Sequence, residues 1–191
     1  MISTFRKLTS QTPGDLKASA SRYATLPLAF LCLLLIAGTG CTQLNDERIP
    51  SMAVNIDLGN QGIWNTYGVH AYGQYNYFIF TNTIRQPAGF SYTYNSATGY
   101  GGVLLIGGQN VFSGDMAPLA YDLSCPVERL PDVRVYIDNN TLDAVCPDCD
   151  SHYNVVEANG APISGPAESM HYALTPYQCY ATISGGYVIA R

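Results

Sequence analysis

Four cysteines beyond the N-terminal segment are the residues best suited to chemistry in this 191-residue chain. Cys125 stands before a proline, and Cys146 and Cys149 follow about twenty residues later in the segment CPDC. Two loops that present thiolates to each other are a common framework for sulfur-rich metal sites. In an oxidising compartment the same thiols can form a disulfide instead. The spacing therefore predicts a metal site or a disulfide built from Cys125, Cys146 and Cys149.

The residues around these cysteines resemble the Rieske iron–sulfur domain family. That family carries C-x-H in one loop and C-x-x-H-G-S-x-F/Y in a second loop. Cys125 and Cys146 match the two family cysteines. Ser151 and Tyr153 match the hydroxyl residues that hydrogen-bond the cluster sulfurs in the family. Further along the chain, the segment SGPAES, which contains Pro166, resembles the proline loop that covers the cluster.

This resemblance is clearest over residues 101–191 and implies both a fold and a cofactor. The implied fold is all-β: a Rieske-like antiparallel β-sandwich with a small cluster-binding subdomain of two facing loops. The implied cofactor is a [2Fe–2S] cluster that transfers single electrons, with Cys125 and Cys146 on the same iron. On this basis the chain is expected to be an electron-transfer protein or a descendant of one.

Both family histidines are replaced in this sequence. Val127 stands at the first histidine position and Cys149 at the second. A Rieske cluster needs two cysteines and two histidines, and a valine side chain has no donor atom. We therefore expect the cluster to be lost or altered, with Glu128 or His152 as possible replacements for the missing ligand. Two alternatives remain open: zinc held by the three cysteines with His152 or Cys179, or a disulfide from Cys125 to one cysteine of the second loop.

Short apolar segments with a two-residue period recur between turn residues, which predicts an all-β chain without long helices. The expected strands cover residues 54–58, 75–80, 90–94, 102–106 and 133–138, and a closing hairpin turns at Ser184-Gly185-Gly186. The run at 102–106 is apolar throughout and lies between glycine pairs, so it is expected to be buried on both faces. Cys179 lies in the first strand of that hairpin, where a buried thiol of the core is expected. Residues 64–100 are rich in tyrosine. They are expected to add strands to the same domain, with glycan or protein binding as the alternative.

The N-terminal segment has the pattern of an export signal. Basic residues precede a short apolar run at residues 26–37, which is too short for an ordinary membrane span of about 20 residues. Gly38-Thr39-Gly40-Cys41 resembles the lipobox of bacterial lipoproteins, in which the cysteine becomes the lipidated N-terminus. We therefore expect a signal peptide at 1–40, a lipidated Cys41 with a tether at 41–51, and the β domain at 52–191. The protein is then expected in the bacterial cell envelope, anchored to a membrane.

Composition narrows the possible functions further. The chain is 47% hydrophobic and 12% charged, which excludes a disordered protein. From Cys41 onward there are five arginines, no lysine and thirteen acidic residues, which argues against a nucleic-acid partner and leaves an unidentified protein partner open. The sequence has no G-x-S-x-G or H-E-x-x-H motif. We expect no enzyme, and at most an electron carrier.

Overall fold

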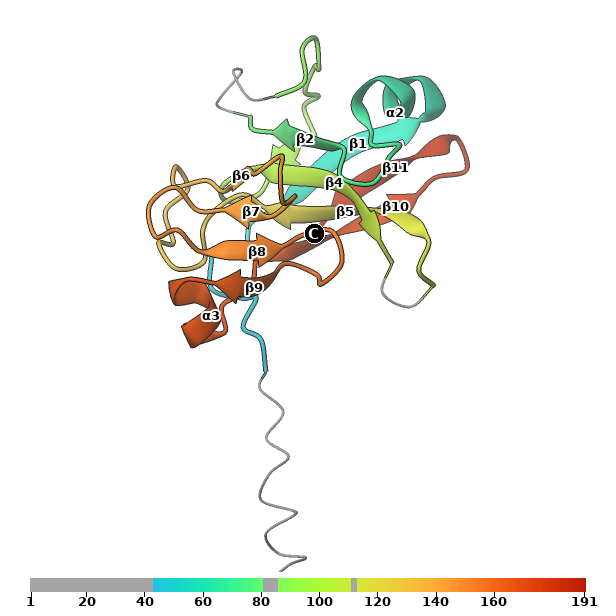
Figure 1. Ribbon diagram of the computed structural model, residues 1–191. Helices are drawn as coiled ribbons and strands as arrows, with labels where there is room; N and C mark the ends of the chain where they lie inside the picture. Colours follow the sequence, from blue (N-terminus) through green and yellow to red (C-terminus); the bar gives the residue numbers. More distant parts are fainter. Residues whose placement is uncertain (1–42, 81–85, 111–112) are drawn as a thin grey trace, which may run out of the picture. The chain divides into compact units, whose positions relative to one another are not determined.

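The computed structural model describes residues 43–80, 86–110 and 113–191. The predicted signal peptide and Cys41 lie outside these residues. The described part of the chain is built mainly from two antiparallel sheets with two short helices, which confirms the all-β prediction (Figure 1). Residues 43–191 form one compact unit. Among the described residues, no helix has the length and apolar character needed to cross a membrane.

The larger sheet has seven strands in the order β2-β4-β5-β10-β11-β1-β3. Every neighbouring pair in this sheet is antiparallel. The strands are β1 (Val54–Asn60), β2 (Tyr75–Phe78), β3 (Ala97–Thr98), β4 (Val103–Gln109), β5 (Met116–Asp122), β10 (Pro176–Ala181) and β11 (Gly185–Ala190). The first and last parts of the chain therefore share one sheet.

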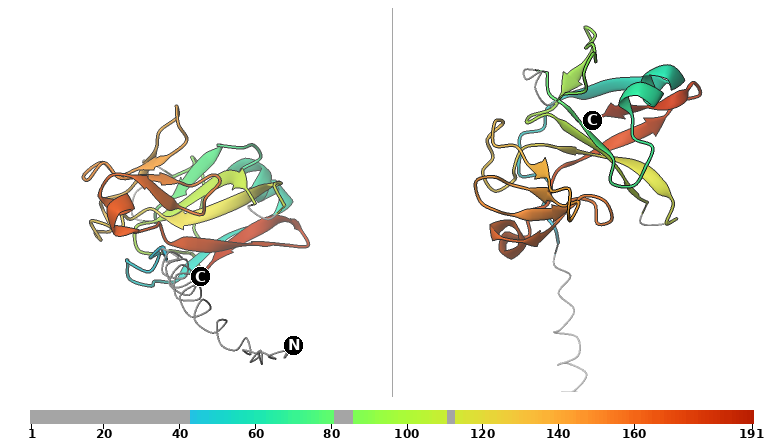
Figure 2. Two further views of the ribbon diagram at one scale, coloured as in Figure 1. Left: turned by 60° about the horizontal axis from the view of Figure 1, so that its bottom comes forward. Right: turned by 45° about the horizontal axis from the view of Figure 1, so that its top comes forward.

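The smaller sheet has four strands in chain order, and it is formed by the segment between β5 and β10. Its strands are β6 (Tyr136–Ile137), β7 (Ala144–Val145), β8 (His152–Asn154) and β9 (Ala161–Ser164). Figure 2 shows this segment, in orange, lying beside the larger sheet. One apolar cluster contains residues of both sheets, so the small sheet packs on the large one.

Apolar residues in the sequence explain the burial of strands β1 and β4. In β1, Val54, Ile56 and Leu58 are buried and Asp57 between them is exposed, as a two-residue period requires. Strand β4 is buried on both faces, which confirms the prediction for the apolar run at residues 102–106. Strand β4 lies between β2 and β5 in the sheet and has a core cluster on each face.

The predicted closing hairpin is confirmed. Strands β10 and β11 pair from Gln178 opposite Ala190 to Ala181 opposite Tyr187. Gly185 adopts a φ of 85° at the turn, a conformation that favours glycine. The Thr182 amide closes the turn by donating a hydrogen bond to the Gly186 carbonyl at 2.9 Å.

Two predicted strands differ from the structure. Residues 90–94 form no strand, and Phe90 packs edge-on against the rings of Phe78 and Tyr92. Ring contacts of this kind satisfy aromatic side chains without strand pairing. Within residues 133–138, only the two residues of β6 pair as a strand. Residues 64–100 nevertheless contribute β2 and β3 to the larger sheet.

The two helices are shorter than the windows in which a helical period can be recognised. Helix α2 (Gln61–Tyr67) begins after Asn60, whose side chain accepts a hydrogen bond from the Gly62 amide. It buries the Trp64 ring against the large sheet. Helix α3 (Pro166–Met170) begins at the proline of the segment that resembles the family's proline loop.

Candidate metal site

The first cysteine loop leaves the large sheet at the end of β5. Cys125 is fully buried, and its amide donates a hydrogen bond to the Val133 carbonyl at 3.0 Å. The Arg129 amide donates to the Cys125 carbonyl at 2.8 Å, which closes a tight turn after the cysteine. The Ser124 amide, one residue before, donates to the Asp122 carboxylate at 2.7 Å. The position of Cys125 is therefore held by bonds on both sides.

The second cysteine loop joins β7 to β8 in the small sheet. The Cys146 amide donates to the Ser151 carbonyl at 3.0 Å, and the Asp150 amide donates to the Cys146 carbonyl at 3.2 Å. Asp150 has a φ of 54°, in the left-handed region that ends a turn. This turn brings Cys149 back beside Cys146.

The two loops bring three sulfur atoms together. The Sγ atoms of Cys125, Cys146 and Cys149 all lie within 4.8 Å of one another, and those of Cys125 and Cys149 are 3.7 Å apart. Cys125 and Cys146 are buried, and Cys149 is half-buried. This group can hold a metal ion, since thiolates at such distances are suitable ligands for one.

Hydroxyl groups lie against two of the sulfurs. The Tyr153 hydroxyl is 3.5 Å from Cys125 Sγ, and the Cys149 thiol donates to Ser151 Oγ at 3.2 Å. Ser151 Oγ also accepts a hydrogen bond from the Ala167 amide at 3.1 Å. Pro166, the third residue predicted to lie around the site, begins the helix that carries this amide.

Close approach of the sulfurs changes their acidity. The Cys146 thiol donates a hydrogen bond to the sulfur of Cys125, and this bond lowers the pKa of Cys125 against the opposing effect of burial. Backbone amides of the loop and the Tyr153 hydroxyl lower it further. The pKa of Cys146 is raised, because it gives up the bond to Cys125 on ionising and because it is buried. Cys125 is therefore the thiol that ionises first, and thiolate is the form that binds metals.

The structure does not bring the other predicted ligands into this group. His152 faces two carboxylates of the segments before and after β7, with nitrogen–oxygen distances of 3.7 Å to both Asp143 and Asp150. Val127 packs against the apolar cluster and offers no donor. Cys179 lies in β10 against the other apolar cluster, where burial raises its thiol pKa to about 12. The zinc prediction with His152 or Cys179 as fourth ligand is thus not supported by their positions.

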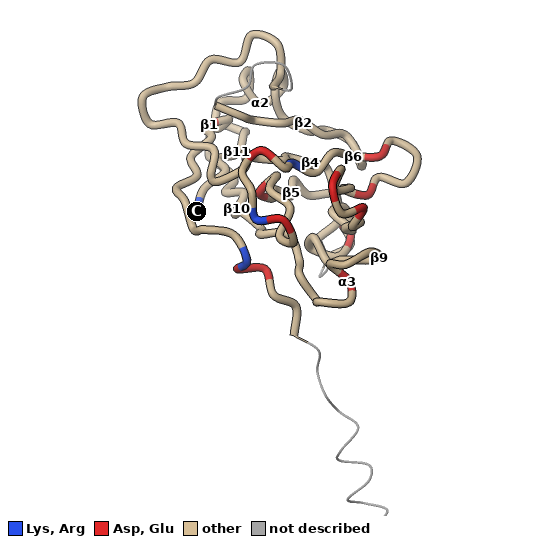
Figure 3. The backbone as a smooth tube through the Cα atoms, turned by 90° about the vertical axis from the view of Figure 1, so that its left-hand side faces the viewer, with Lys and Arg blue, Asp and Glu red and all other residues tan. Residues whose placement is uncertain are grey.

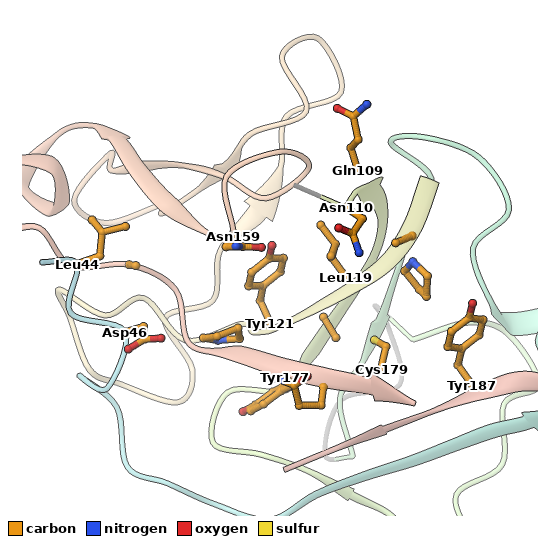
Figure 4. A pocket seen from close by; sticks show the side chains of 16 residues that line it. Leu44, Asp46, Gln109, Asn110, Leu119, Tyr121, Asn159, Tyr177, Cys179 and Tyr187 are labelled. Atoms are coloured by element: carbon orange, nitrogen blue, oxygen red, sulfur yellow. The ribbon is translucent and has the colours of Figure 1, made fainter. Parts of the chain in front are cut away.

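Cys179 lines a separate pocket between β5 and β10. This pocket has a volume of about 590 Å³, and Figure 4 shows Tyr121, Tyr177 and Tyr187 on its walls together with Cys179. None of the three clustered cysteines lines it. The pocket and the sulfur group are therefore different sites.

The predicted disulfide is not formed within the described part of the chain, where all four cysteines are free.

The segment that carries the second cysteine loop is acidic. Residues 130–165 contain six acidic residues and one arginine, and Figure 3 shows the acidic positions along the chain near β6, β9 and α3. A negative surface of this kind attracts cations.

Asp122 supports the site and was not identified from the sequence. Its carboxylate is fully buried and accepts hydrogen bonds from the amides of Tyr100, Gly101 and Ser124 and from the Tyr177 hydroxyl. The signal available in the sequence is an acidic residue inside the apolar run AYDLSC, immediately before the first cysteine loop. A buried carboxylate needs several donors, so such a residue marks a point where several segments meet.

Comparisons with known proteins identify no family for this chain. No protein-family model, curated protein or solved structure matches it.

Proposed function

We propose that this chain is an envelope lipoprotein whose β domain is stabilised by one thiophilic metal ion, zinc, bound between its two cysteine loops. Its role is then structural or binding, for a protein or glycan partner, and not catalytic. The convergence of three sulfurs from two loops is the observation that supports this proposal. Retention on the membrane would come from a lipidated Cys41.

The distances between the sulfurs favour a single ion. Ligands about 2.3 Å from a tetrahedral zinc ion lie about 3.8 Å from one another. The Sγ atoms of Cys125 and Cys149 are 3.7 Å apart, and Cys146 Sγ lies within 4.8 Å of both. These separations are compatible with three ligands on one ion.

A [2Fe–2S] cluster does not fit these residues. The cluster needs four ligands, and the described residues bring together three. By the resemblance, Cys125 and Cys149 would bind different irons, which bridging sulfides hold apart. Their 3.7 Å separation is instead that of two ligands on one ion. We derive no electron-transfer step from this site.

We also propose that the β domain descends from a Rieske domain. The hydroxyls of Ser151 and Tyr153, at the family's hydroxyl positions, lie next to cysteine sulfurs. We propose that the domain is a divergent Rieske-like β-sandwich, with the small sheet as its loop-bearing subdomain. On such a scaffold, replacing two histidines by Val127 and Cys149 exchanges a two-iron ligand set for a one-ion set.

Metal analysis of protein purified without oxygen tests this function. We expect a colourless protein with about one zinc ion per chain, since four-coordinate thiolate sites prefer zinc. Cys146→Ser should lose the metal and lower the melting temperature. Cys179→Ser is the matched control and should keep the metal, because Cys179 lies outside the group.

Two results would overturn the proposal. A red-brown protein with about two irons and two sulfides per chain would restore the electron-transfer function. A metal-free protein whose thiol count rises by two on reduction would show that a disulfide joins the loops. Either result leaves the cysteine positions unchanged but assigns them different chemistry.

A further inference from the structure

The two cysteine loops share one backbone conformation. The first is Cys125-Pro126-Val127-Glu128-Arg129 and the second is Cys146-Pro147-Asp148-Cys149-Asp150. In each loop the amide of the fifth residue donates to the carbonyl of the leading cysteine, at 2.8 Å and 3.2 Å. In each loop this fifth residue has a positive φ, 58° for Arg129 and 54° for Asp150. The loops therefore correspond residue by residue, although their sequences differ after the proline.

The correspondence continues into the segments that lead to the two loops. The residue before each leading cysteine also pairs with an antiparallel segment, Ser124 with Arg134 and Val145 with His152. The two loops are therefore equivalent in the residue that precedes the turn as well as in the turn itself.

Glu128 occupies the position that Cys149 has in the second loop. Cys149 is the fourth residue of its turn, and its side chain belongs to the sulfur group. Glu128 is the fourth residue of the first turn, so its side chain leaves the backbone at the equivalent position. Val127, which the family resemblance compares with a ligand, corresponds instead to Asp148, which is not a member of the group. The loop geometry thus selects a different residue from the one the sequence motif selects.

We propose that Glu128 is the fourth ligand of the metal ion, which gives a site of three thiolates and one carboxylate. Glu128 is half-buried, and among the described residues its carboxylate has no hydrogen-bond or ion-pair partner to give up. The carboxylate is not among the clustered ligand atoms in the structure, so binding requires its side chain to rotate towards the ion. Zinc accepts carboxylate oxygen at about 2.0–2.2 Å, which completes a tetrahedron.

This inference rests on the proposed metal site, and cobalt(II) replacing zinc tests it. Thiolate-to-cobalt absorbance increases with the number of bound thiolates, so wild-type protein should show a three-thiolate intensity. Glu128→Cys should raise the intensity by about one third, because it supplies a fourth thiolate to a tetrahedral site. Val127→Cys is the matched control and should leave the intensity unchanged. Loss of a residue that only hydrogen-bonds a metal ligand weakens metal affinity by roughly 10–100-fold. Glu128→Ala removes a ligand itself, so it should weaken zinc affinity by at least as much.

The outcomes separate this inference from the function on which it depends. If wild-type protein binds no cobalt, the proposed metal site itself is wrong. If wild-type protein binds cobalt through three thiolates but Glu128→Cys and Glu128→Ala behave like wild type, the site stands and Glu128 is not its ligand. A rise in intensity with Val127→Cys would assign the fourth position to residue 127. Cooperative unfolding of each variant confirms that its loops are folded.

Discussion

At the scale of single residues, the Ser151 hydroxyl joins the second cysteine loop to helix α3. It accepts hydrogen bonds from the Cys149 thiol at 3.2 Å and from the Ala167 amide at 3.1 Å, and the side chain is fully buried. We expect Ser151→Ala to lower the free energy of unfolding by about 1–3 kcal/mol, because the buried Ala167 amide loses its acceptor. Denaturant unfolding of reduced, metal-free protein measures this change.

Ser169→Ala is a suitable control in the same helix. Ser169 is exposed, and its hydroxyl donates to the Pro166 carbonyl at 2.9 Å without joining separate segments. Its replacement should change the free energy of unfolding by no more than about 0.5 kcal/mol. Equal effects of the two substitutions would contradict the role assigned to Ser151.

At the scale of elements, Asp122 connects the end of β5 to β10 and to the segment before β4. Its carboxylate accepts bonds from the amides of Tyr100 and Gly101, from the Ser124 amide at 2.7 Å and from the Tyr177 hydroxyl. Asp122→Asn replaces one acceptor oxygen with an NH₂ group that faces other donors. We expect a loss of about 1–3 kcal/mol for each donor left unpaired, measured by urea unfolding.

The pH dependence of that loss follows from the acidity of Asp122. Burial raises the pKa of this carboxyl above its ordinary value of 3.8, although the hydrogen bonds to it act in the opposite direction. The folded protein therefore holds the proton more tightly than the unfolded chain. This contribution to stability is fully present below pH 3.8 and is lost as the pH rises through the folded pKa.

Asparagine does not titrate, so the variant isolates this effect. As the pH rises from 3.8 through the folded pKa of Asp122, the difference in unfolding free energy between wild type and Asp122→Asn should become smaller. Above the folded pKa it should stay constant. Urea unfolding at a series of pH values measures the difference. A difference that widens with rising pH would mean that the hydrogen bonds outweigh burial and that the folded pKa lies below 3.8.

At the scale of the whole molecule, the large sheet separates two apolar clusters. Strand β4 contributes Leu104 to the cluster that contains Cys125 and Cys146, and Leu105 to the cluster that contains Trp64. Consecutive side chains of a strand point to opposite faces, so these two leucines are matched probes of the two faces. Both are fully buried.

We expect Leu104→Ala and Leu105→Ala each to cost about 2–5 kcal/mol of stability. Only Leu104→Ala should weaken zinc binding, because only its cavity opens beside the cysteine loops. Competition with a chromophoric chelator, under conditions where both variants are folded, measures the affinities. Equal weakening by both variants would show that the site follows global stability and not the packing of one face.

Local patterns in the sequence were sufficient to predict much of this fold. Alternation of apolar residues identified β1, a continuous apolar run between glycines identified β4, and a glycine-containing turn identified the closing hairpin, because each of these signals lies within one short segment. Residues 90–94 show the same alternation but form no strand. A two-residue period identifies the apolar side of a segment, but it does not specify which part of the chain packs against that side.

The sequence by itself identified Cys125, Cys146 and Cys149, because cysteine spacing is visible along the chain. Only the tertiary structure decided that Cys179 and His152 lie apart from them, and that Glu128 corresponds to Cys149 in the other loop. The role of Asp122 at a junction of segments was likewise visible only in three dimensions. The reason is physical: a ligand set depends on which loops meet in space, and that meeting is determined by the packing of two sheets and not by any local period.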